Sequence, residues 1–202
     1  MPDFTERKRS SEEEYFLKKE QELIEKLRQK AKAEAHRKSL AEAVGIENEQ
    51  ILDVLQDMGF DRETVMLLYL VPLLDVAWSD GSLSGEERAL VLEAAQSHGV
   101  GEGHPAYEKL QGWLAAKPPK ETFDRALQVI RDLMGFQTAE QRQISGQKLV
   151  DACERIAAAS GGFLGMGSKV SSEEKAVMKR VAAAIEAAHA ESAKKLLGNI
   201  EA

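Results

Sequence analysis

The chain has 202 residues, of which 30% are charged and 43% hydrophobic, and its formal net charge is -7. This length allows one packed domain with an appendage, or two small domains. The acidic balance argues against a general nucleic-acid surface, because phosphate binding requires a concentrated basic face. Cys153 is the single cysteine, so the chain cannot form an internal disulfide, which is compatible with a reducing compartment.

Neither the N-terminal segment nor the most apolar segment of the sequence indicates insertion into a membrane. Residues 1–30 are dominated by charge and contain no apolar core of a signal peptide. The most apolar run, residues 65–78, is interrupted by Pro72 and Asp75 and is too short to cross a bilayer. We therefore expect a cytoplasmic protein without a transmembrane segment.

The first predicted element is a long charged helix. Ser11 and Glu14 stand at capping-box spacing and predict a helix start, and Gly45 predicts its end after Val44. A thin apolar line runs along this helix: Phe16, Leu23, Ile24, Leu27 and Ala31. A helix this polar does not build a core by itself, so residues 1–45 are predicted to be a solvent-exposed arm or one half of an interface.

After Gly45, apolar residues recur at helical spacing and almost nothing is typical of a strand. Capping boxes are predicted for Ser84 with Glu87 and for Thr138 with Gln141, and Ser171 with Glu174 predicts another. The predicted helices cover residues 49–58, 62–79, 84–98, 106–116, 119–134, 138–159 and 171–197. The fold class is therefore all-α, with a helical bundle over residues 46–202 behind the arm.

Two segments, 74–88 and 156–175, share one order of features. Each has an alanine-rich apolar helix, a turn of small residues, one apolar residue (Leu83 or Val170) and a serine-capped acidic helix start. This predicts a helical hairpin that is used twice. In the second segment Ser160 stands where the first has Asp80, and the loop is longer and rich in glycine.

The pattern from Ala77 through Asp80-Gly81 and Ser84 to Glu87 resembles the TerB-like family, the all-helical tellurite-resistance class. The resemblance covers the chain from about residue 65 to its end. It implies a compact helical domain that acts in a stress-associated complex and has no established catalytic chemistry.

The acidic residues of this turn allow two interpretations. Asp80, Glu86 and Glu87 could supply oxygen ligands to calcium or magnesium. Alternatively, Asp80 with Gly81 forms a turn, and the two glutamates stabilise the positive end of the helix that they begin. The spacing does not match a twelve-residue calcium loop, which favours the turn.

The N-terminus carries a second resemblance. Seven residues stand at the mutual spacing of the inhibitory segment in the family of the mitochondrial ATP synthase inhibitor protein: Phe4, Arg7, Glu12, Glu13, Tyr15, Phe16 and Leu27. The similarity covers residues 4–30 and needs no gap from Phe4 to Phe16. It implies a helix wedged into a catalytic interface of a rotary ATPase, with aromatic and leucine anchors and charged contacts.

This chain departs from that family because it lacks the histidine-rich stretch and the long heptad coil, and because it adds a helical domain. The residues by themselves also fit a solvated helix face, or a helix that docks in a groove or a coiled coil.

No catalytic motif is recognisable. The sequence has no phosphate loop, no G-x-S-x-G, no H-E-x-x-H and no paired cysteines. We therefore expect a non-catalytic interaction or regulatory protein that presents its N-terminal helix to a protein partner, with inhibition of a rotary F-type ATPase as the alternative. The expected partner-binding residues are Phe4, Arg7, Glu12, Glu13, Tyr15, Phe16, Leu23 and Leu27.

Overall fold

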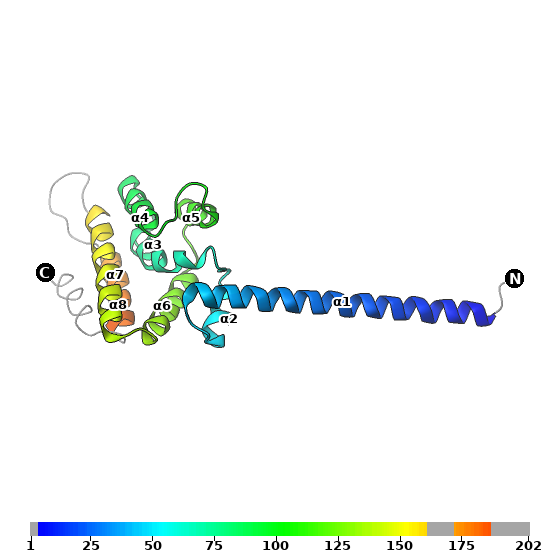
Figure 1. Cartoon of the computed structure of the whole chain (residues 1–202). Coiled ribbons are helices and arrows are strands. Elements are labelled where there is room, and N and C mark those ends of the chain that lie inside the picture. Colours follow the sequence, from blue (N-terminus) through cyan, green and yellow to red (C-terminus); the bar gives the residue numbers. More distant parts are fainter. Residues whose placement is uncertain (1–3, 161–171, 187–202) are drawn as a thin grey trace.

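The computed structural model describes residues 4–160 and 172–186, with side chains for residues 15–159 and 172–185. In these ranges the chain is helical and has no strand, which confirms the predicted all-α class. Figure 1 shows a bundle of helices from which one long helix projects. The elements are α1 (Phe4–Val44), α2 (Glu49–Asp57), the 3-10 helix η1 (Val65–Leu70), α3 (Val71–Ala77), α4 (Gly85–Ser97), α5 (Pro105–Ala115), α6 (Lys120–Gly135), α7 (Ala139–Ser160) and α8 (Ser172–Glu186).

Helix α1 is longer than the sequence predicted. The predicted start at Ser11 is wrong, because the helix already begins at Phe4. Residues 4–11 contain no glycine or proline and are rich in glutamate, lysine and arginine, which are good helix formers. The predicted end is correct: Gly45 adopts a φ of 77° and its amide donates to the Ala41 carbonyl at 2.8 Å.

Helix α3 is the centre of the bundle. All seven of its residues are buried, and it packs against α4, α6, α7 and α8. Helix α2 lies between α1 and α6, at the side of the bundle where the long helix leaves it (Figure 1). A helix that is buried on every side has to be surrounded by other helices, so the short α3 sets the arrangement of its longer neighbours.

The single helix predicted over residues 62–79 is wrong. The chain forms a 3-10 helix over η1 and begins a new α-helix at Val71. Pro72 explains the change, because proline lacks a backbone N–H and is accommodated only in the first turn of an α-helix. Pro72 occupies that first turn in α3.

The two capping boxes of α4 and α7 are confirmed. The Ser84 hydroxyl accepts from the Glu87 amide at 3.1 Å, and the Glu87 carboxylate accepts from the Ser84 amide at 2.8 Å. The Thr138 and Gln141 pair makes the same reciprocal bonds at 3.2 and 3.0 Å. The predicted cap at Ser171, the glycine-rich loop at 161–167 and the predicted extension of the last helix to residue 197 lie outside the described residues.

The last turns of α1 belong to the bundle. Leu40 is fully buried in the core, and Ala41 and Val44 are partly buried against it. The domain boundary predicted at residue 45 therefore lies after residues that already pack on the bundle. The part of α1 that is free of the bundle ends before Leu40.

An ion pair with a buried carboxylate ties α8 to the centre of the bundle. Asp75 of α3 is 4% exposed and pairs with Arg180 of α8, whose other terminal nitrogen donates to Asp124 of α6 at 3.0 Å. Burial raises the pKa of Asp75, although the Arg180 guanidinium opposes the shift. The sequence pattern did not reveal this pair, since its members are 105 residues apart.

Replacing Leu40 with alanine should lower the free energy of unfolding by about 2–5 kcal/mol, because the change leaves a cavity in a filled core. Urea denaturation followed by circular dichroism measures this loss. Lys32→Ala is the control, since Lys32 is exposed on the same helix and the change should stay within about 0.5 kcal/mol. Equal stability of Leu40→Ala and the wild type would contradict the burial of the α1 base.

Candidate functional site

The free part of α1 exposes an unusual amount of apolar surface. Every side chain from residue 15 to residue 36 is exposed. Six large apolar side chains are among them, with these exposed fractions: Tyr15 58%, Phe16 68%, Leu17 58%, Leu23 58%, Ile24 41% and Leu27 59%. Isolated apolar side chains on a surface are ordinary, whereas a group along one helix face marks a contact surface.

Most of these side chains share one face. At about 100° of rotation around the helix axis per residue, five of them and Ala31 fall within a sector of about 120°. We call them the apolar stripe: Phe16, Leu17, Leu23, Ile24, Leu27 and Ala31. Leu17 was absent from the predicted apolar line, although its spacing of seven residues to Ile24 and again to Ala31 places it at the edge of the same face.

Tyr15 lies off the stripe, about 100° from Phe16 around the helix axis. The two rings meet edge to face with centroids 6.0 Å apart. The Lys19 ammonium lies 5.7 Å from the centre of the Tyr15 ring. The structure therefore assigns the two aromatic residues to different faces, and Phe16 is the one that continues into Leu23 and Leu27.

The other four predicted contact residues lie on the same helix. Phe4, Arg7, Glu12 and Glu13 are within the described backbone of α1, but their side chains lie outside the described part. The structure thus places all eight predicted residues on one continuous helix, and it describes side-chain exposure for Tyr15, Phe16, Leu23 and Leu27.

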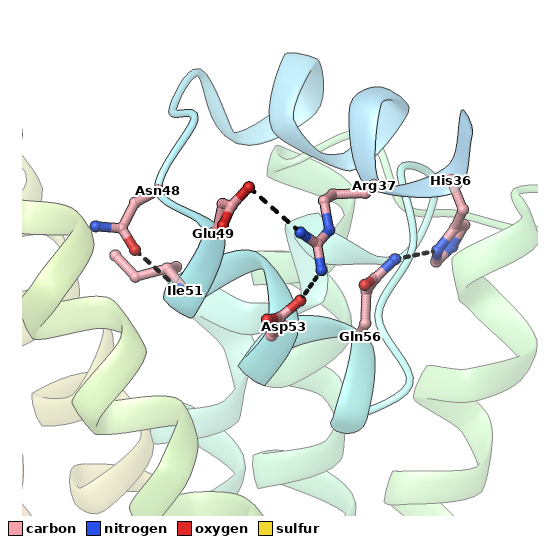
Figure 2. Close-up of polar contacts among 7 residues, drawn as sticks. All are labelled: His36, Arg37, Asn48, Glu49, Ile51, Asp53 and Gln56. Atoms are coloured by element: carbon pink, nitrogen blue, oxygen red, sulfur yellow. Dashed lines mark hydrogen bonds and ion pairs between the residues drawn. The ribbon is translucent and has the colours of Figure 1, made fainter. Parts of the chain in front are cut away.

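Polar contacts fix the base of the arm (Figure 2). The Arg37 guanidinium pairs with Asp53 and lies 3.7 Å from the Glu49 carboxylate, both on α2. The adjacent residue of α1, His36, has its Nδ1 2.8 Å from Nε2 of Gln56, which lies one turn further along α2.

The start of α2 is fixed as well, because the Asn48 side chain accepts from the Ile51 amide at 3.1 Å. Together with buried Leu40, these contacts hold the direction in which α1 leaves the bundle.

The stripe points away from that base. Leu40 lies about 140° around the helix axis from Leu27 and about 160° from the middle of the stripe. One side of α1 therefore packs on the bundle at its end, and the opposite side carries the exposed apolar residues. The stripe is not an extension of the bundle core.

The acidic turn at Asp80 is built as a turn. Asp80 Oδ1 accepts from the Ser82 amide at 2.8 Å and from the Ser82 hydroxyl at 3.0 Å. Glu86 is exposed, and the buried Glu87 carboxylate closes the cap of α4. Burial raises the pKa of Glu87, although its hydrogen bonds to Ser84 oppose this shift. Among the residues whose side chains are described, 15–159 and 172–185, no group of three or more His, Cys, Asp or Glu residues could hold a metal ion.

The remaining reactive side chains have structural contacts. Cys153 is fully buried, and burial raises the pKa of its thiol to about 12. The His98 ring stacks on Tyr69 with centroids 6.4 Å apart, and His104 Nδ1 accepts from the Ala106 amide at the start of α5. Each of these groups contributes to packing or to a helix cap.

Asp80→Asn should change the free energy of unfolding by no more than about 0.5 kcal/mol, because an asparagine oxygen can accept the same two hydrogen bonds. Asp80→Ala loses both bonds and should cost about 1 kcal/mol. We expect no heat of binding when calcium or magnesium is titrated into the wild-type protein. A stoichiometric isotherm that disappears in Asp80→Asn would contradict the turn interpretation.

None of the described helices is long and apolar enough to cross a membrane.

Comparisons with known proteins leave the family of this chain open. No protein-family model, no curated protein and no solved structure matches the chain. The TerB-like resemblance and the resemblance to the ATP synthase inhibitor family therefore stay predictions from the sequence.

Proposed function

We propose that this is a non-catalytic interaction protein of the cytoplasm, which binds a protein partner through the apolar stripe of α1. One observation carries the proposal: five large apolar side chains, each at least 41% exposed, lie on one face of a helix that extends free of its own bundle. The bundle serves as the base that holds this helix.

Covering the exposed apolar stripe contributes binding free energy. Large apolar side chains at the centre of an interface are typically worth about 2 kcal/mol or more each, whereas charges at its rim contribute little. An amphipathic helix with anchors spaced three, four and seven residues apart is a common form of protein recognition. Phe16 and Leu23 are seven residues apart, Leu23 and Leu27 are four apart, and Ile24 and Leu27 are three apart.

A regulatory role in a stress-associated complex is what the TerB-like resemblance implies, and it agrees with this proposal. In such a role the helical domain positions the arm and performs no chemistry. The buried thiol of Cys153 and the structural contacts of His98 and His104 support a non-catalytic interpretation.

Phe16→Ala combined with Leu27→Ala should abolish capture of a partner by tagged full-length protein from a native lysate, because the change removes two anchors. Lys18→Ala with Lys19→Ala is the matched control and should only weaken capture. Circular dichroism should show the same fold for both variants, since all four side chains are exposed. If the apolar variant retains every protein that the wild type captures, the stripe is not the binding surface.

Inhibition of a rotary F-type ATPase is the second candidate. The observation in its favour is that α1 is one continuous helix from Phe4, with Tyr15, Phe16 and Leu27 all more than half exposed. The inhibitory segment of that family acts as a helix that wedges into a catalytic interface, and a helix free of its own bundle is available for such a contact.

Full-length protein, or a peptide of residues 2–32, should then slow ATP hydrolysis by the rotary ATPase of the same organism. Tyr15→Ala with Phe16→Ala should remove the inhibition, because both aromatic anchors are lost. Absence of inhibition by the full-length wild-type protein would exclude this function and leave the general interaction role.

A further inference from the structure

The centre of the stripe has a self-complementary pattern. Leu23 and Leu27 are flanked at equal distances by an acid on one side, Glu20, and a base on the other, Lys30. At about 100° per residue these four side chains lie within a sector of about 80°. A copy of the helix that runs in the opposite direction would therefore present the same two leucines with the charges exchanged.

From this pattern we propose that the stripe is the contact between two copies of this chain, whose α1 helices pair antiparallel about a two-fold axis beside residue 25. The inference rests on the proposed function, since it names the partner of the same surface. Around the axis Leu23 lies opposite Leu27 of the second copy, and the symmetry makes this contact twice.

The charges and the second row of apolar residues fit the same register. Glu20 lies opposite Lys30 of the second copy, which gives two attractive pairs at the ends of the leucine layers. On the flank, Ile24 meets Ile24 of the second copy across the axis, and Leu17 meets Ala31. At the outer ends Phe16 lies opposite Glu34, whose methylene groups give the ring an aliphatic neighbour.

A parallel pair in register is disfavoured by the same residues. It would place Glu20 opposite Glu20 and Lys30 opposite Lys30, so the attractive pairs would become repulsive. The antiparallel arrangement also keeps the two bundles at opposite ends, where each meets only the tip of the other arm.

The surface available agrees with a dimer. Phe16, Leu17, Leu23, Ile24 and Leu27 are 41–68% exposed. Side chains of this size then offer on the order of 100 Å² each, so two copies would bury roughly 1,000 Å², the lower limit for a specific interface. Glu20 and Glu34 lie within the stripe sector, and buried carboxylates there would disfavour insertion into lipid.

Sedimentation equilibrium of the full-length protein tests the inference. We expect a mass about twice the 22.3 kDa of one chain over micromolar concentrations. Glu20→Lys alone and Lys30→Glu alone should each self-associate at least about tenfold more weakly, because each places like charges opposite one another. An equimolar mixture of these two variants should recover the wild-type affinity as a heterodimer, since every charge pair is attractive again.

Cysteine crosslinking reports the direction of the helices. Glu20→Cys mixed with Lys30→Cys should form a disulfide-linked pair, while either variant alone should not, because the two positions face each other only in the antiparallel register. Buried Cys153 does not compete for the oxidant. Crosslinking of Glu20→Cys with itself would overturn the antiparallel pair.

A monomeric wild type would overturn the inference, and sedimentation of that monomer with phosphatidylserine–phosphatidylcholine vesicles would identify a membrane as the covering surface. A monomeric wild type would not by itself contradict the proposed function. A monomer whose protein partner is still lost in Phe16→Ala with Leu27→Ala would keep the interaction role and exclude only the second copy as the partner.

Discussion

The burial of Leu40 is the contact on which the shape of the molecule depends. It belongs to a helix that is otherwise exposed from residue 15 to residue 36, yet it is completely covered by the bundle. Arg37 and His36 add polar contacts to α2 on adjacent positions, so the helix is held at its base by both apolar and charged groups. Because a helix is stiff along its length, fixing one end also fixes the direction of the remainder.

This constraint separates the two faces of α1. The side that includes Leu40 is used inside the molecule, and the opposite side carries the apolar stripe. The stripe cannot be covered by rotating the helix about its axis, since rotation would expose Leu40 and separate Arg37 from Asp53. A surface of this kind is available to a partner without a preceding conformational change, which favours rapid association.

Sequence reasoning succeeded where local chemistry determines the structure. The capping boxes at Ser84 and Thr138 placed the starts of those helices correctly, because caps act within one turn. The failures have equally local causes. At Ser11 the capping-box spacing was present, but the preceding residues, which include the good helix formers Glu6, Arg7, Lys8 and Arg9, extend the helix to Phe4. Around Pro72 the apolar spacing predicted one helix, while the proline divides the backbone into η1 and α3.

Non-local contacts could not be predicted from the chain alone. Leu40 follows a charged segment, and nothing near it in the sequence shows that α2 and the core will cover it. The candidate site was foreseen as a helix with Phe16, Leu23 and Leu27, but its geometry required the structure, since only the position of the bundle shows which face is free. The doubled hairpin stays a prediction, although α3 of its first half packs against α7 and α8 of its second half.

The pairing of Asp75 with Arg180 has a consequence for the order in which parts of the protein open. Helix α8 supplies the paired counter-charge for a carboxylate in the middle of α3, so its departure would leave that carboxylate buried without the Arg180 guanidinium. Small excursions of α8 from the bundle are therefore suppressed, and its amide hydrogens should exchange with solvent only when the core itself opens. Helix α8, the last described helix, lies at the surface, yet it should open only together with α3, the most buried helix.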